Sequence, residues 1–109
     1  MLDGAQPGDH RELARRVWAA VGQGGADPTV AVYVEALGLA AVRTPPYPEA
    51  ARAVAEAWTA WFAGRLPGPD EERWSQARAA LALVDGLLLV RLAAGPDAAA
   101  DAARALGVG

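Results

Sequence analysis

Residues 70–94 of this chain read DEERWSQARAALALVDGLLLVRLAA, and this segment constrains the architecture more than any other. Its apolar residues recur at intervals of three and four, which is typical of a helix buried on one side. The acidic residues 70–72 suit the positive end of a helix dipole, and Gly95-Pro96 ends the pattern. Asp85-Gly86 is a common turn dipeptide, but the periodicity continues on both sides of it without a phase break. The segment is therefore predicted to be one long helix.

This predicted helix is apolar on two faces. The first face, sufficient to cover the core of one chain, consists of Trp74, Ala77, Leu81, Val84, Leu88 and Leu92. The second face is rich in small residues and consists of Ala79, Ala82, Leu83, Gly86, Val90 and Ala93. Small side chains let two helix backbones pack closely, and an apolar face left in water would form a large exposed patch. We predict that a second copy of the chain covers this face; the alternative is burial under the short helix that follows.

Proline and glycine delimit three further helices. One begins near Asp9, a candidate N-cap, and ends at Gly22; one begins at Pro48 and ends before Leu66; one runs over 97–106 and is closed by Gly107. On the first two, the side chains predicted to be buried are Leu13, Ala14, Val17, Trp18 and Val21, and Ala51, Val54, Ala55, Trp58, Trp61 and Phe62. Those predicted to face solvent include His10, Arg11, Glu12, Arg15 and Arg16. Residues 1–8 are expected to be a flexible N-terminus.

The remaining segment starts at Asp27-Pro28, a strong helix-start signal, and runs to about Arg43. It is apolar on nearly every side, which predicts a central place in the fold. Glu35 is the one charge in its middle, and a buried carboxylate must be paired, hydrogen-bonded or protonated. A salt bridge to Arg43 or Arg91 is one interpretation, and a polar contact in a ligand pocket is the other. Asp85, at the edge of the core face of the long helix, has the same two interpretations.

Composition agrees with an all-α domain of about five helices spanning residues 1–109. The chain contains 28 alanines and no isoleucine, and 53% of its residues are hydrophobic. Alanine is the best helix former, whereas the residues that favour strands are sparse. A core of this size is sufficient for a single domain.

Several functions have little support in the sequence. The formal net charge is −3, all ten basic residues are scattered arginines, and no basic patch predicts nucleic-acid binding. There is no cysteine, one histidine and one serine, so we expect no metal site, no cofactor and no nucleophile–base pair. The first residues lack the pattern of a secretory signal, and the longest apolar stretch, residues 28–42, is short for a bilayer. A cytoplasmic protein that is not an enzyme is expected.

Three stretches together resemble the C-terminal domain of tetracycline-repressor (TetR) family transcriptional regulators. The first is VYVEALGLA at residues 32–40, followed by Pro46-Tyr47; the second is WTAW at residues 58–61; the third is ALVDGLLL at residues 82–89, on a long penultimate helix before a short last one. Each motif alone is weakly specific, but their order and spacing are more so, and the resemblance covers residues 13–106.

The resemblance implies a helical domain for ligand sensing and dimerisation in a transcriptional repressor. The last two helices of each subunit would form an intersubunit four-helix bundle, and an effector bound among the earlier helices would change the spacing of two DNA-binding heads. This sequence departs from the family because it contains no helix-turn-helix with a basic recognition helix. We therefore expect this chain alone not to bind operator DNA.

Two sets of residues are candidates for these roles. A small, mostly apolar effector is expected to contact aromatic and polar groups on converging helices: Trp18, Tyr33, Glu35, Leu37, Trp58, Trp61, Phe62 and Asp85. The homodimer interface is expected to comprise Ala79, Ala82, Leu83, Gly86, Val90, Ala93, Ala99, Ala102, Ala103 and Leu106. Two alternatives stay open. One is a purely structural dimerisation module with a filled core and no ligand, and the other is a small helical-bundle enzyme, which the missing catalytic groups disfavour.

Overall fold

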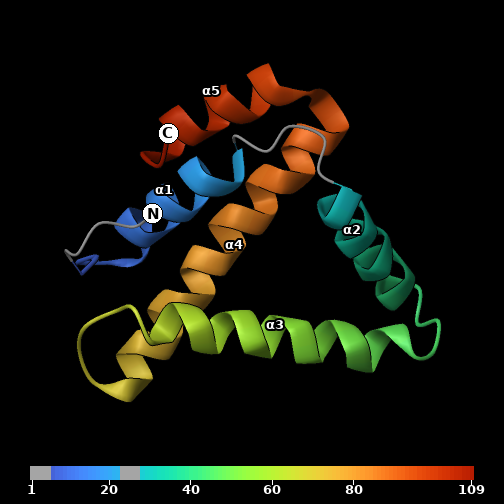
Figure 1. The fold of residues 1–109 in the computed structure, drawn as a ribbon, viewed down its shortest axis with the longest axis horizontal. Helices are drawn as coiled ribbons and strands as arrows, with labels where there is room; N and C mark the ends of the chain where they lie inside the picture. Colours follow the sequence, from blue (N-terminus) through green and yellow to red (C-terminus); the bar gives the residue numbers. More distant parts are fainter. Residues whose placement is uncertain (1–5, 23–27) are drawn as a thin grey trace.

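The computed structural model describes residues 6–22 and 28–109, and every regular element in these ranges is an α-helix (Figure 1). The five helices are α1 (His10–Gly22), α2 (Pro28–Ala41), α3 (Tyr47–Ala63), α4 (Asp70–Ala94) and α5 (Pro96–Leu106). The prediction of an all-α fold with about five helices is thus confirmed. The predicted capping residue Asp27 and residues 1–5 of the predicted flexible N-terminus lie outside the described residues, and Pro7 is buried.

The long helix α4 is the centre of the fold. It runs diagonally in Figure 1 and packs against α1, α3 and α5, whereas α2 packs against α3 at the edge of the molecule. The helix continues through Asp85 and Gly86 as predicted, and both its ends coincide with the predicted ones. The core accordingly forms where α1, α3 and α5 meet α4.

The start of α1 is fixed by two side chains. Asp9 Oδ1 accepts a hydrogen bond of 2.9 Å from the Glu12 N–H, which confirms the predicted N-cap. The His10 N–H donates to Gln76 Oε1 on α4 at 2.8 Å, and His10 Nδ1 lies 2.6 Å from the same oxygen. His10 is therefore half-buried between α1 and α4, and the prediction that it faces solvent is wrong.

Arg16 also departs from its predicted exposure, since only 13% of its side chain is exposed. Its Nε lies 2.9 Å from Glu12 Oε1. A long arginine stem can pack on the protein while its charged end pairs with a carboxylate, which explains the burial of a residue predicted to lie in water. Arg15, paired with the same carboxylate, remains exposed as predicted.

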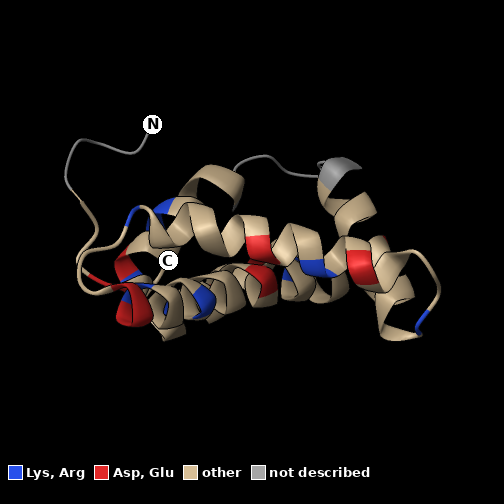
Figure 2. Ribbon diagram, turned by 90° about the horizontal axis from the view of Figure 1, so that it is seen from below, with Lys and Arg blue, Asp and Glu red and all other residues tan. Residues whose placement is uncertain are grey.

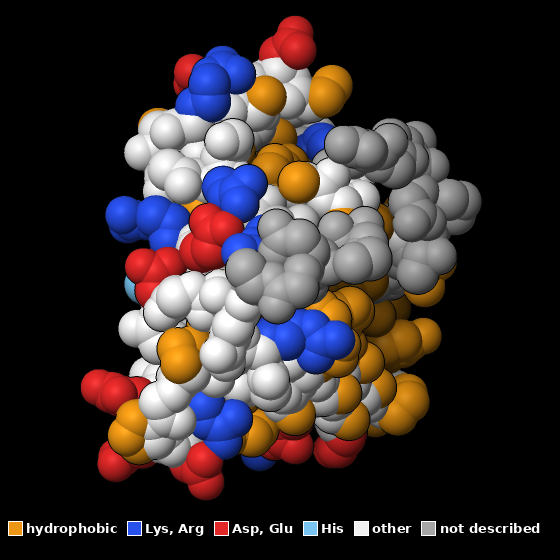
Figure 3. Space-filling view, turned by 60° about the vertical axis from the view of Figure 1, so that its left-hand side comes forward, with side chains coloured by type: hydrophobic (Ala, Val, Ile, Leu, Met, Phe, Trp, Pro, Cys, Tyr) orange, Lys and Arg blue, Asp and Glu red, His pale blue; other side chains and the backbone are white. Residues whose placement is uncertain are grey.

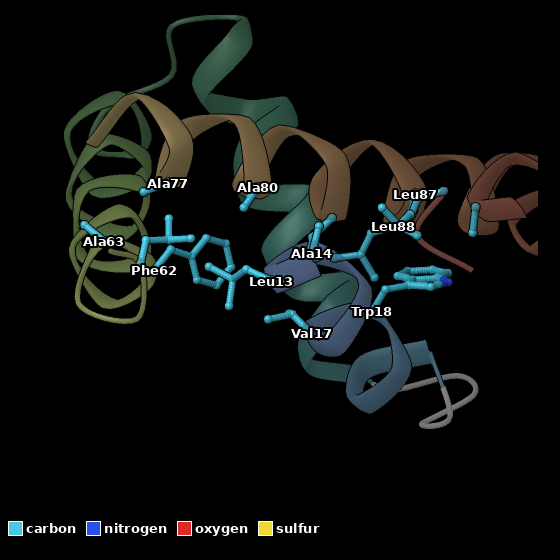
Figure 4. Close-up of a cluster of buried hydrophobic side chains, with 14 of the residues drawn as sticks. Leu13, Ala14, Val17, Trp18, Phe62, Ala63, Ala77, Ala80, Leu87 and Leu88 are labelled. Atoms are coloured by element: carbon cyan, nitrogen blue, oxygen red, sulfur yellow. The ribbon is translucent and has the colours of Figure 1, made fainter. Parts of the chain in front are cut away.

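The largest fully buried side chains are Phe62, Leu13, Leu87 and Val108. Leu13 and its neighbours on α1 lie beneath α4 together with Phe62 of α3 (Figure 4). At the other end, Gly107 adopts a left-handed conformation (φ 77°) and closes α5 as predicted, which turns Val108 back into the core. The core therefore joins four of the five helices.

The predicted central position of α2 is wrong. None of its residues from Val30 to Ala41 is buried, and Val32 is 65% exposed. The reason is competition for α4: α1 and α3 already cover the first apolar face of that helix, so α2 packs on the far end of α3 (Figure 1). An apolar composition indicates that a helix can be buried on any side, but here α2 has only α3 as its main packing partner.

The second apolar face of α4 is only partly covered by α5. Ala82, Gly86 and Ala93 are exposed, whereas Ala79, Leu83 and Val90 are half-buried. On α5, Ala99 and Ala103 are each 1% exposed because they pack inside the same chain, so their predicted place in a dimer interface is wrong. Ala102 is half-buried and Leu106 is exposed. The part of this side of α4 that stays exposed is a stripe formed by Ala82, Gly86, Leu89 and Ala93, of which Leu89 is 48% exposed.

The surface charges are interspersed by sign. Basic and acidic residues alternate along the molecule in the view of Figure 2, in line with the scattered arginines of the sequence. Among the described residues, no helix is long and apolar enough to cross a membrane.

Candidate functional site

An apolar cavity of about 300 Å³ lies among the first four helices. Its walls come from α1, α2, α3 and α4, and they consist of Val17, Val21, Val30, Tyr33, Val54, Trp58, Phe62, Leu81, Val84, Asp85 and Leu88. The volume lies at the lower end of the range of small-molecule sites, which is roughly 300–1,000 Å³. The cavity exists because α2 stands away from α4, so the apolar side chains facing this space do not meet.

A wider depression of about 660 Å³ adjoins the cavity and opens to solvent. The two share Val17, Val21, Val54 and Trp58, and the outer one adds Trp61 and the alanines of the same helices. Hydrophobic side chains gather in the lower half of Figure 3, at the height of α3. We call this depression the mouth of the cavity, because a molecule reaching the inner walls passes these residues.

Two polar side chains of the cavity form a pair, Tyr33 on α2 and Asp85 on α4. The Tyr33 hydroxyl donates a hydrogen bond of 2.9 Å to Asp85 Oδ2. Burial is the main cause that raises the pKa of the Asp85 carboxyl, although the bond from Tyr33 opposes it. Burial, and then the neighbouring carboxylate, raise the pKa of Tyr33 to about 12. This bond is the one polar link that the structure describes between α2 and α4.

Aromatic side chains of α3 form one wall. Trp58, Trp61 and Phe62 have ring centroids 5.4–6.0 Å apart in tilted or edge-to-face arrangements. Phe62 is buried, whereas Trp58 is 46% and Trp61 37% exposed, which contradicts their predicted place in the core. The cause is the edge position of α2, which leaves this side of α3 facing the mouth. The Arg65 guanidinium stacks over the Trp61 ring at 3.7 Å.

Four of the eight residues predicted to contact a ligand meet in the cavity. These are Tyr33, Trp58, Phe62 and Asp85, and Trp61 lies at the mouth. Trp18 does not line either space; it is buried against α4, with the Arg91 guanidinium 5.3 Å from its ring. Leu37 is half-buried on α2 and lines neither space.

Glu35 is exposed on α2, so the prediction of a buried, paired carboxylate is wrong. Burial was expected because the helix was expected to be central. Neither predicted partner is near it in the described interactions: Arg91 contacts Trp18 and donates to the Val21 carbonyl at 3.5 Å, and Arg43 lies beyond the end of the helix. Glu35 and Asp85 therefore do not form the close carboxylate pair that would suggest acid–base catalysis.

The sequence did not single out the aliphatic lining. Periodicity predicts core positions for six of these residues, and the seventh, Val30, belongs to the segment that is apolar on nearly every side. The six are Val17, Val21, Val54, Leu81, Val84 and Leu88. Periodicity indicates that a side chain faces inward but not whether another side chain meets it there. No signal in the sequence distinguishes a filled interior from a hollow one.

The described residues contain no group of three or more His, Asp or Glu side chains that could hold a metal ion. No protein-family model, no curated protein and no solved structure matches this chain.

Proposed function

We propose that this chain is a sensory domain that binds a small, mostly apolar ligand and pairs with a second copy of itself, as the C-terminal domains of TetR-like regulators do. The observation that carries the proposal is the apolar cavity with its single Tyr33–Asp85 pair. A mostly apolar pocket with few, fixed polar groups is the usual form of a small-molecule site. The sequence resemblance supports the same function.

The exposed stripe on α4 supports self-association. Ala82, Gly86, Leu89 and Ala93 follow one another at steps of three and four, so they share one side of the helix, and all are exposed. A β-carbon built on Gly86 would meet no atom of the same chain within 4 Å. A two-fold pair of α4 helices would cover this stripe with itself, which is the commonest closed arrangement for identical chains. DNA contact in such regulators belongs to another domain, and the interspersed surface charges support no such role here.

Ligand binding is tested with N-phenyl-1-naphthylamine, a neutral apolar dye that brightens when it leaves water. We expect saturable binding at one site per chain. Val54→Trp, on the shared wall of cavity and mouth, should fill the space and abolish binding. Val32→Trp, at an exposed position of α2 outside both spaces, should leave binding unchanged. A dye signal that does not saturate, or that survives Val54→Trp, would leave the purely structural dimerisation module as the better interpretation.

Self-association is tested by sedimentation of Gly86→Leu. The new side chain meets nothing within its own chain but separates the paired helices, so we expect the dimer to weaken by at least about tenfold while helicity is kept. Gly38→Leu on α2 is the matched control, since its built β-carbon also meets no atom. Equal association of the two variants, or a monomeric parent at micromolar concentration, contradicts the proposed pairing.

A further inference from the structure

We infer that the cavity selects an apolar amine: a ligand whose hydrocarbon body lies against the aliphatic and aromatic walls and whose ammonium group pairs with the Asp85 carboxylate. This rests on the proposed function of the cavity as a ligand site, and it names the chemistry of the ligand. Three observations carry it, namely the sign of the lining charge, the state of the carboxylate oxygens and the aromatic wall.

The lining carries one carboxyl group and no basic side chain. Of its eleven residues, Asp85 is the only one with a charged side chain, and only Tyr33 and Trp58 among the others carry a polar side-chain atom. The described ion pairs engage Glu12, Asp70 and Asp101 but not Asp85, and the described hydrogen bond to Asp85 comes from Tyr33. Among residues 6–22 and 28–109, no arginine or histidine therefore pairs with this carboxylate.

One carboxylate oxygen stays available. Oδ2 accepts the bond from Tyr33, which fixes the orientation of the group. No buried side-chain oxygen of the described residues lacks a partner, so the unbonded Oδ1 remains accessible, and Asp85 lines the cavity. A ligand that fills the cavity removes the remaining water from this oxygen. Removing water from a carboxylate is costly unless an opposite charge or a donor replaces it.

The aromatic wall favours the same sign of charge. Trp58 lines both the cavity and the mouth and is 46% exposed. The face of an indole ring attracts ammonium and guanidinium groups, as Arg65 already demonstrates over the neighbouring Trp61. A carboxylate ligand meets repulsion from Asp85, and a neutral hydrocarbon leaves Oδ1 without a partner. An amine satisfies both the carboxylate and the ring.

The test uses three compounds that share one hydrocarbon cage: 1-adamantylamine, 1-adamantanol and 1-adamantanecarboxylate, titrated by calorimetry at pH 7. An aliphatic amine is protonated at this pH. We expect the amine to bind at least about tenfold tighter than the alcohol, because a charge-assisted hydrogen bond replaces a neutral one, and the carboxylate to bind weakest.

Two variants test whether Asp85 causes the preference for the amine over the alcohol. Asp85→Asn keeps the shape of the side chain and removes its charge, so we expect the amine and the alcohol to bind alike. Glu35→Gln makes the same change of charge on an exposed residue of α2 outside the cavity, and we expect the preference to remain. Thermal unfolding of both variants checks that they are folded.

The outcomes separate the two proposals. If the alcohol binds as tightly as the amine, or the preference survives in Asp85→Asn, the inference is overturned while the cavity stands as a ligand site. If neither these compounds nor the naphthylamine dye bind, the proposed function fails, and the inference fails with it.

Discussion

Two regions of this molecule use apolar residues in opposite ways. In the filled region, formed by α1, α5 and the side of α4 between them, apolar side chains meet one another, and Leu13, Leu87 and Val108 are at most 1% exposed. In the hollow region, formed by α2, the exposed side of α3, the facing side of α4 and the end of α1 with Val17 and Val21, apolar side chains line a cavity, as Trp58 does, or face water, as Val32 does. The filled region stabilises the chain, whereas the hollow region leaves apolar surface for a ligand.

The largest expected effect contrasts a fully buried residue of the filled region with an exposed residue of the hollow region. Leu13→Ala removes a fully buried side chain, and we expect it to lower the free energy of unfolding by about 2–5 kcal/mol. Val32→Ala, 65% exposed on α2, should change it by less than about 0.5 kcal/mol. Urea denaturation followed by circular dichroism measures both. Similar losses for the two variants would contradict the division into filled and hollow regions.

A smaller effect concerns the C-terminal ends of α2 and α5, which have the same capping hydrogen bonds but different residues at the left-handed position. After α2, the N–H groups of Arg43 and Thr44 donate to the carbonyls of Ala40 and Leu39; after α5, Gly107 and Val108 repeat the pattern. In each pattern the first donor has a left-handed backbone, Arg43 with φ 64° and Gly107 with φ 77°. Only glycine adopts this conformation without strain.

We therefore expect opposite signs for two substitutions. Arg43→Gly should stabilise the fold by up to about 1 kcal/mol, because it relieves the left-handed strain. Gly107→Ala should destabilise it by about 1 kcal/mol or more, since the new β-carbon also comes within 3.3 Å of the Arg11 side chain. Thermal midpoints of the two variants and the parent measure the difference. Stabilisation by both, or by neither, would contradict this interpretation of the caps.

The smallest effect is a difference in pH dependence between Glu12 in the filled region and Asp85 in the hollow one. Two arginines, Arg15 and Arg16, lower the pKa of Glu12 to about 2, so its contribution to stability is present above pH 4.5 and is lost as pH falls. Burial raises the pKa of Asp85 above 3.8, so the folded protein binds the extra proton, and its contribution is lost as pH rises through that pKa.

Neutral isosteres distinguish the two carboxyls. As the pH rises from 3 to 7, the free energy of unfolding of Asp85→Asn should increase relative to that of the parent. Over the same rise in pH, that of Glu12→Gln should decrease relative to the parent. Thermal unfolding at each pH gives both curves. A difference between Asp85→Asn and the parent that grows on acidification would reverse the assigned effect of burial on Asp85.

Local patterns in the sequence were sufficient for the elements but not for their arrangement. The ends of α4, the N-cap at Asp9 and the closing Gly107 follow from residue types that act within a few positions. The place of α2 does not, because it depends on which helix covers α4 first. The wrong predictions for Glu35 and Trp58 follow from the wrong position predicted for α2. The contact between Tyr33 and Asp85 joins residues 52 positions apart, and periodicity carries no information about such contacts.

The attachment of α2 has a kinetic consequence. This helix packs mainly on α3, touches the core through Val30 and bonds to α4 through Tyr33 and Asp85, so we expect it to move outward more easily than the helices that hold Leu13 and Leu87. Movements of one helix on this scale take about microseconds to milliseconds. We expect a bound ligand to dissociate on that timescale, or more slowly if its affinity is high. The fraction of chains with ligand bound would then follow a fall in the free ligand concentration, while the rest of the chain stays folded.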